Sequence, residues 1–199
     1  IRKNIMIGKN ITLDDMFRDD FDAVFIGTGV WRPKKLGIKG ESLGNVHFAI
    51  DYLKTPKAYD LGKKVIVVGA GNVAMDVART AIRNGAHEVS IMYRKGEEDM
   101  PAERIEIEHA KIDGVKFNLF KSPLEFSETG IKYENTKEDD NSIAFEEADS
   151  ILIAISQTAR DLIVKNNTGL SLGENGLLES DENGKKKKKG VFASGDVVT

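Results

Sequence analysis

The chain has 199 residues, 40% of them hydrophobic and 31% charged, which suits one large domain or one domain with attached pieces. Its net charge of −3 gives no reason to expect nucleic acid or an anionic membrane as a partner. No run approaches the roughly 18 apolar residues of a membrane span. Without cysteine these residues hold no disulfide, thiolate metal site or C-x-x-C pair, and the three histidines lack metal-ligand spacing. This composition is compatible with a cytoplasmic location.

The N-terminal residues predict short elements. Residues 1–20 indicate a strand followed by a helical turn capped by Thr12. Residues 21–29, FDAVFIGTG, predict a buried strand that ends in Gly27-Thr28-Gly29. These glycines permit close approach to a ligand or to another segment, although an ordinary strand-to-loop turn has the same composition.

A loop and a helix are expected next. Residues 31–44 predict a loop that crosses between two bodies of structure. Residues 45–60 have apolar positions at helical spacing, and Pro56 should end that helix. The apolar positions are Val46, Ala49, Ile50 and Leu53.

Residues 64–76, KVIVVGAGNVAMD, combine an apolar strand, a glycine turn and the start of a helix. The pattern G-x-G-x-x-A is the sequence form of a dinucleotide-binding βαβ unit. Gly69 allows the tight turn, Gly71 lets the backbone approach a pyrophosphate, and the small Ala74 lets the helix lie against the sheet. The first helical residues, Asn72 and Val73, then present free N–H groups to the phosphates.

A helix over residues 72–84 and a strand over residues 89–93 complete this unit. Arg94 and Lys95 follow the second strand, where an NAD-specific site has an acidic residue that binds the ribose hydroxyls. An arginine fork grips a 2′-phosphate, which a carboxylate repels. We therefore predict NADP(H) rather than NAD(H). The alternative is that Arg94 is a solvated turn residue.

The chain then alternates between helix and strands. Pro101 is expected at the first position of a helix over about residues 102–112, with Ile105, Ala110 and Ile112 facing a core. Residues 115–145 predict short antiparallel strands with an acidic hairpin tip at residues 138–141.

The C-terminal part returns to buried strands. Residues 149–156 predict a strand buried on both faces, as in parallel sheets. The five lysines at residues 185–189 have no interleaved aromatic residue, so a solvated loop is expected there rather than a nucleic-acid patch. The final run, GVFASGDVVT, predicts a strand that leads into Gly195-Asp196.

Three motifs, GTG at 27–29, GAGNVA at 69–74 and GVFASGD at 190–196, resemble in their order and spacing the flavoprotein reductases with two dinucleotide-binding domains. The runs FDAVFIGTG, GKKVIVVGAGNVAMDVARTA and YRKGEEDMPAERIEIEHA resemble the NADPH-oxidising small subunits of glutamate synthase. This resemblance implies an NADPH domain inserted into an FAD domain. It also implies that Fe–S clusters belong to parts of the protein outside these residues.

The resemblance assigns roles to particular residues. It places the GTG stretch at the first crossover and Ala154-Ile155 at the return, where the family usually has glycine in place of Ser156. It gives Asp196 a hydrogen bond to the ribityl chain of FAD. The family often has arginine directly after M-P-A, whereas this chain has Glu103 before Arg104, the second candidate phosphate ligand.

The expected fold is α/β: a Rossmann-like NAD(P)-binding domain with a parallel sheet plus an antiparallel β-meander, flanked by partial segments of an FAD-binding domain. The expected ranges are 1–44 and 161–199 for the partial FAD segments and 45–160 for the NADPH domain. The family's first glycine motif for FAD is absent from these residues, and the chain does not begin with Met. We therefore expect a fragment that is inactive alone and binds FAD weakly or not at all.

The implied reaction is hydride transfer from NADPH to FAD, for which we nominate no catalytic acid or base, because the cofactors carry the chemistry. Electrons would pass to a partner, such as a large glutamate synthase subunit, in glutamate biosynthesis. A ferredoxin–NADP oxidoreductase subunit, a dihydropyrimidine dehydrogenase-like domain and a non-catalytic nucleotide-binding module remain alternatives. Thioredoxin reductase is excluded because its NADPH domain carries redox cysteines.

Overall fold

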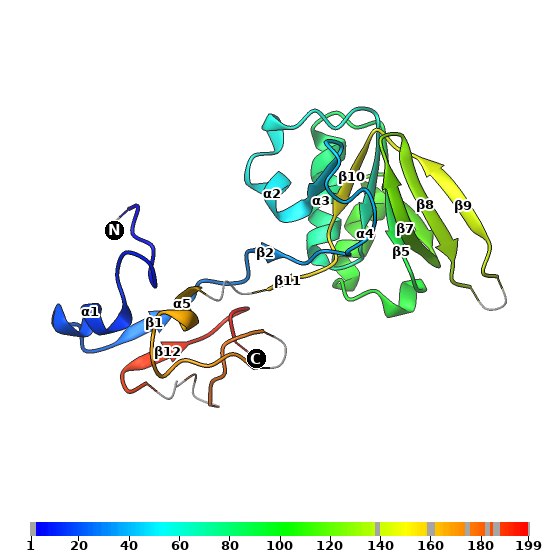
Figure 1. Cartoon of the computed structure of the whole chain (residues 1–199). Helices are drawn as coiled ribbons and strands as arrows, with labels where there is room; N and C mark the ends of the chain where they lie inside the picture. Colours follow the sequence, from blue (N-terminus) through cyan, green and yellow to red (C-terminus); the bar gives the residue numbers. More distant parts are fainter. Residues whose placement is uncertain are drawn as a thin grey trace. The chain divides into compact units, whose positions relative to one another are not determined.

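A computed structural model describes residues 3–137, 140–158, 162–173, 176–181, 184 and 188–198 (Figure 1). The chain forms two compact units, Pro33–Ser156 and a second made of Ile1–Arg32 with Gln157–Thr199. The mixed α/β class, with both parallel and antiparallel sheets, is confirmed. The boundary expected after residue 44 falls inside the first of these units. β2 (Arg32–Pro33) pairs with β11 (Gln157–Thr158) where the chain passes between the units.

A five-stranded parallel sheet forms the centre of unit Pro33–Ser156, in the order β3-β10-β4-β5-β6. Its strands are β3 (Val46–Phe48), β4 (Lys64–Val68), β5 (Glu88–Tyr93), β6 (Lys116–Leu119) and β10 (Ser150–Ile153). Alternate side chains of β4 enter two different cores, Val65 and Val67 on one face and Ile66 and Val68 on the other. The sheet is therefore covered on both faces, as parallel sheets require.

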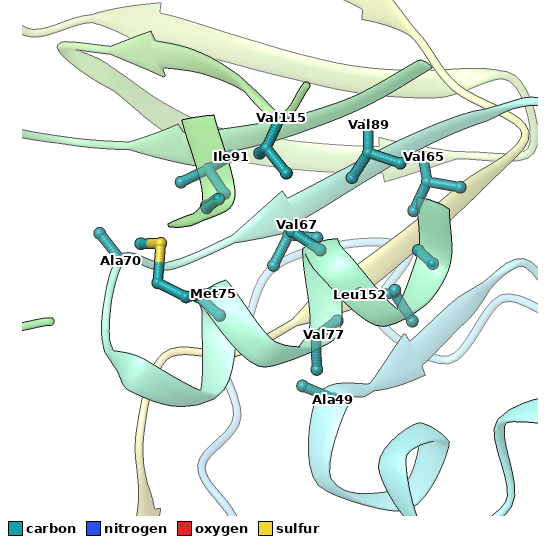
Figure 2. Packing of buried hydrophobic residues seen from close by; sticks show 14 of the residues in the cluster. Ala49, Val65, Val67, Ala70, Met75, Val77, Val89, Ile91, Val115 and Leu152 are labelled. Atoms are coloured by element: carbon teal, nitrogen blue, oxygen red, sulfur yellow. The ribbon is translucent and has the colours of Figure 1, made fainter. Parts of the chain in front are cut away.

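Helices cover the face that carries Val65 and Val67. They are α2 (Ala49–Lys54), α3 (Asn72–Arg83) and α4 (Arg104–Ile112), with single 3₁₀ turns at η1 (Pro56–Ala58) and η2 (Glu97–Asp99). Figure 2 shows Met75 of α3 directed toward the strands and Val77 beside Ala49 of α2. These side chains are fully buried, so α3 is held by its apolar stripe.

An antiparallel meander covers the other face, which carries Ile66 and Val68 (Figure 1). It consists of β7 (Lys121–Ser127), β8 (Gly130–Asn135) and β9 (Ile143–Glu147). Glu146 of β9 accepts hydrogen bonds from Lys121 Nζ at 2.9 Å and Asn118 Nδ2 at 2.5 Å. This half-buried carboxylate ties the outermost strand of the meander to the end of the parallel sheet.

The other unit contains a parallel pair of strands, β1 (Val24–Ile26) and β12 (Val191–Ala193). α1 (Leu13–Arg18) begins at the expected Thr12 cap, and α5 (Leu162–Lys165) lies nearby in the same core. Buried Asn167 accepts a hydrogen bond from the Leu13 N–H at 2.6 Å and donates one to the Ile163 carbonyl at 2.7 Å. Asn167 therefore joins the two helices of this unit.

The expected βαβ elements are confirmed: the strand over 64–68, the helix from residue 72, the strand at 89–93 and the buried parallel strand near 150. Other expectations are wrong. Residues 46–48 form a strand instead of the first helical turn, because they pair with β10. Residues 116–119 pair in parallel with β5, so they extend the main sheet rather than the meander.

The orientation expected for the helix after Pro101 is also wrong in part. α4 starts at Arg104, so Pro101 lies before the helix instead of at its first position. Ile105 and Ile112 are 54% and 79% exposed, while Ala110 is buried as expected.

Among the strands, Phe25 is 67% exposed, so the strand at 24–26 is not buried on both faces. Residues 138, 139 and 185–187 of the two charged loops lie outside the described residues.

Asp149 supports a prediction about pH. Its Oδ2 accepts the N–H groups of Lys64 at 2.8 Å and Lys63 at 2.7 Å, and these bonds hold the pKa of Asp149 below its usual value of 3.8. A depressed carboxylate pKa stabilises the fold above the unfolded-state pKa, and this stabilisation is lost as pH falls through the folded-state value. We expect Asp149→Asn to lower the free energy of unfolding at pH 7, with a difference from wild type that shrinks below about pH 4. Urea titrations at pH 7 and pH 3 measure this.

The exposed Glu98, changed to Gln, is the control for loss of one negative charge. A difference between wild type and Asp149→Asn that is the same at both pH values would contradict the prediction.

Candidate dinucleotide site

Gly69 makes a turn that no other residue fits without strain. Its φ is +123°, and a Cβ placed there would lie 2.3 Å from the carbonyl oxygen of Ala154. Its N–H donates to the Met92 carbonyl at 3.0 Å, while the Ala154 N–H donates to Val68 at 2.8 Å. Gly69 is therefore held between the ends of the two strands that flank β4. The tight turn expected at Gly69 is present.

Gly71 differs from Gly69 in its geometry. It is the N-cap of α3 with a φ of −86°, and a Cβ there would meet only Pro101 Cγ at 3.9 Å. No side chain caps this helix, so the first-turn N–H groups at Asn72 and Val73 lack an intrahelical acceptor. Ala74 is fully buried against the sheet. These features fit a pyrophosphate at the start of α3.

The carboxyl ends of three adjacent strands bring the expected residues to one edge. β10, β4 and β5 are neighbours and all parallel, and they are followed by Ala154-Ile155, the run 69–74 and Arg94-Lys95 respectively. The order in which strands are added to the sheet also reverses here. β5, the next strand along the chain, lies on one side of β4, and the later strand β10 lies on the other. Open α/β sheets bind ligands in the crevice at such a switch point.

Arg94 and Lys95 have a fixed backbone and exposed side chains. The Arg94 carbonyl accepts a hydrogen bond from Thr136 Oγ1 at 2.5 Å, and the Lys95 carbonyl accepts the Phe120 N–H at 3.2 Å. Lys95 Nζ lies 3.3 Å from Asp99 Oδ1. In the described part of the chain, no acceptor contacts the Arg94 guanidinium. Arg94 is thus the cation available to an incoming anion.

Two of the three acids in the turn after Lys95 are paired with neighbouring lysines. Glu97 accepts a hydrogen bond from Lys111 of α4 at 2.5 Å, and Asp99 pairs with Lys95. Tyr93 Oη donates to the Asp99 carbonyl at 2.7 Å, which fixes the turn. Sequence spacing gave no sign of Thr136 or Lys111, since both come from distant segments.

The start of α4 is attached to the glycine turn. Ala102 donates its N–H to the Ala70 carbonyl at 3.2 Å, and Asn72 Oδ1 accepts the Glu103 N–H at 2.8 Å. The backbone N–H of Asn72 was expected to face the phosphates of the cofactor. Its side chain also holds the start of α4 through the bond to Glu103. Arg104 follows directly as the first residue of α4 and is exposed. A phosphate contact from Arg104 stays a prediction.

Ser156 occupies a backbone conformation that favours glycine. Its φ is +150°, and its carbonyl accepts the Lys34 N–H at 3.1 Å. The resemblance implied glycine at this position, and the conformation gives a physical reason for that preference. The side chain of Ser156 is exposed just beyond Ala154-Ile155.

The other expected motifs meet in the second unit. In the β1–β12 pair Ile26 lies opposite Ala193, so Gly27-Thr28-Gly29 and Gly195-Asp196 both follow strand ends at the same edge. Gly29 and Gly195 have φ values of +64° and +78°. A Cβ on Gly195 would meet nothing within 4 Å, and Asp196 is exposed. The FAD role of this edge stays a prediction.

The described residues contain no helix long and apolar enough to cross a membrane, and no group of three or more acidic, histidine or cysteine side chains suited to a metal ion.

Comparison with known proteins decides the family. Residues 2–199 match the pyridine nucleotide-disulphide oxidoreductase family. The chain belongs to this family. The chain is 31% identical, over 98% of its length, to the small chain of NADPH glutamate synthase from Halomonas elongata, of which the match covers 48%. It is 42% identical, over 57% of its length, to the NADPH-Fe(3+) oxidoreductase subunit beta of Geobacter sulfurreducens, covering 18% of that protein.

The fold has a solved counterpart in thioredoxin reductase from T. acidophilum, with a TM-score of 0.74 and 23% identity. That likeness covers 89% of this chain and 58% of the other, and it shows the fold alone. The chain thus spans about half or less of the length of these two relatives.

The two glycines of the turn should respond differently to alanine. We expect Gly69→Ala to lower the free energy of unfolding by at least about 2 kcal/mol, because the new Cβ collides with the Ala154 backbone at a positive φ. Gly71→Ala should change it by no more than about 1 kcal/mol, since its φ is negative and the space is open. Urea unfolding of both variants measures the difference. Equal destabilisation would contradict this account of Gly69.

Proposed function

We propose that unit Pro33–Ser156 binds NADPH and presents its nicotinamide to FAD, as part of an NADPH-dependent flavoprotein oxidoreductase. The observation that carries the proposal is the edge of β10, β4 and β5. It combines a glycine turn, an uncapped helix start and an Arg94 guanidinium that no acceptor contacts within the described residues. Such a set provides N–H donors for a pyrophosphate and a cation for a 2′-phosphate.

The chain's own residues act by binding and orientation. The first turn of α3 holds the pyrophosphate, and Arg94 binds the 2′-phosphate from a backbone that Thr136 keeps in place. Ala154 and Ile155, at the end of β10, flank the nicotinamide end of the cofactor. When bound, the nicotinamide supplies a hydride, and no acid or base from this chain is needed. Mutations here should therefore act through cofactor affinity and geometry.

The finer proposal is that the whole protein is the small subunit of a glutamate synthase. The likeness to the Halomonas elongata protein over nearly the full chain supports it. Electrons would then leave through FAD and Fe–S centres outside these residues toward a large partner subunit in the cytoplasm. Gly27-Thr28-Gly29 and Gly195-Asp196 would contribute to the FAD site.

A second candidate is the subunit of another NADPH-dependent reductase. The 42% identity to the Geobacter sulfurreducens subunit over 57% of the chain favours it. Both candidates use the same NADPH site, so they differ in the electron acceptor.

Arg94 provides the test of cofactor choice. We expect Arg94→Ala to weaken NADPH binding by about tenfold to a hundredfold, because one charge-assisted pair with the 2′-phosphate is lost. NADH binding should stay near the wild-type value, since NADH lacks that phosphate. Isothermal titration calorimetry with both nucleotides measures the two affinities.

Lys132, changed to Ala, is the control for loss of a positive charge, because it is exposed on the meander and not at this edge. An unchanged NADPH affinity in Arg94→Ala would remove the basis for predicting NADP(H).

Dye reduction tests the activity of the whole protein. The full-length protein, with FAD added, should oxidise NADPH while reducing a dye such as ferricyanide. If the protein is a glutamate synthase subunit, NADPH should also be oxidised without the dye when the large subunit, glutamine and 2-oxoglutarate are added as the electron acceptor system. NADPH binding without any oxidation would favour a non-catalytic nucleotide-binding module.

A further inference from the structure

Arg79 of α3 connects its own helix to both ends of α4. Its Nη1 donates to Glu106 Oε2 in the first turn of α4 at 3.0 Å. Its Nε donates to Asp113 Oδ2, at the C-cap of α4, at 2.8 Å. The Arg79 side chain is only 18% exposed, so these bonds lie largely out of water. We call these two bonds the Arg79 bridge.

The position of α4 matters because this helix begins at the dinucleotide edge. Its N-cap, Glu103, donates its N–H to Asn72 at the start of α3, and Ala102 is bonded to Ala70 in the glycine turn. Arg104 is the first residue of α4. The Arg79 bridge holds the body of α4, while the Asn72 bond holds its beginning. Together these bonds fix the position of the Arg104 backbone, from which its side chain extends.

The charges around Arg79 show what its loss would do. Burial raises the pKa of Asp76 on α3, and the charge of Glu106 raises it further, whereas Arg79 lowers it. Without Arg79, the repulsion between the carboxylates of Asp76 and Glu106 would lose the opposing effect of this cation. Asp113 would keep its bond to Arg83 at 2.9 Å. The first turn of α4 would therefore be repelled from α3, while its end would stay attached.

We propose that Arg79 is a positioning residue for cofactor selection, which acts through α4 to hold Arg104 beside the 2′-phosphate of NADPH. This inference rests on the proposed NADPH function and on the predicted contact between Arg104 and the 2′-phosphate. Arg79 itself touches no cofactor, because its guanidinium is occupied by Glu106 and Asp113. Its effect should fall on NADPH and not on NADH, since only NADPH carries the phosphate that Arg104 is placed to meet.

The test compares Arg79→Met with Arg83→Met. Both changes remove one arginine charge from α3, but Arg83 is 61% exposed and bonds to Asp113, away from the first turn of α4. Calorimetric titration of the full chain should show NADPH binding weakened about tenfold in Arg79→Met, the value of one charge-assisted hydrogen bond. NADH binding, and both affinities of Arg83→Met, should stay close to wild type. Equal weakening of NADPH and NADH in Arg79→Met would overturn the proposal and indicate a purely structural role.

A double-mutant cycle with Arg104→Ala tests whether Arg79 affects NADPH affinity through Arg104. If Arg79 acts through Arg104, Arg79→Met should cost little further NADPH affinity in the Arg104→Ala background. Additive losses would overturn the proposal. If Arg79→Met does not fold, Arg79→Lys replaces it, because one ammonium keeps the charge without the fork that reaches both acceptors. Wild-type protein that binds no NADPH would instead refute the proposed function, and this inference with it.

Discussion

The close contact between Gly69 and Ala154 is the constraint on which the site depends. A Cβ at Gly69 would lie 2.3 Å from the Ala154 carbonyl oxygen, so β4 and β10 approach at this point only because glycine is present. This contact allows the chain to turn directly from β4 into α3. It also aligns the start of α3 with the ends of β10 and β5. The helix start, Arg94 and Ala154-Ile155 consequently share one edge of the sheet.

Local sequence patterns predicted an element correctly where the elements that pack against it are close in sequence. The apolar run at 64–68, the glycine turn and the helix from residue 72 follow from propensity and period. Val46 was misread because a strand and a helix can share its apolar spacing. Val46 belongs to a strand because it pairs with Ile151, which is more than a hundred residues away in the sequence. In the same way, a short apolar strand at 116–119 carries no sign of whether its partner is parallel or antiparallel.

α4 shows a second limit, which is the choice between two apolar faces. Isoleucines at 105, 107 and 112 allow more than one buried side, and the structure buries Ile107 with Ala110. The deciding groups are charged. Arg79 binds Glu106 and Asp113, so the side of α4 that bears these acids must face α3. Helical periodicity read from apolar residues alone ignores such pairs, and Ile105 and Ile112 are left in water.

The site residues were easier to predict than their support. Gly69 and Arg94 carry recognisable signals, because a positive φ and an arginine fork have few substitutes, whereas Gly71 is recognised by the spacing of the motif. Thr136 bonds to the Arg94 carbonyl and Lys111 bonds to Glu97, each through a single hydrogen bond from a segment for which no local pattern exists. Lys111 and Lys95 also neutralise Glu97 and Asp99, two acids that would otherwise oppose a phosphate beside Arg94. Arg94, whose guanidinium contacts no acceptor in the described part of the chain, therefore lies beside two acids whose charges are already paired.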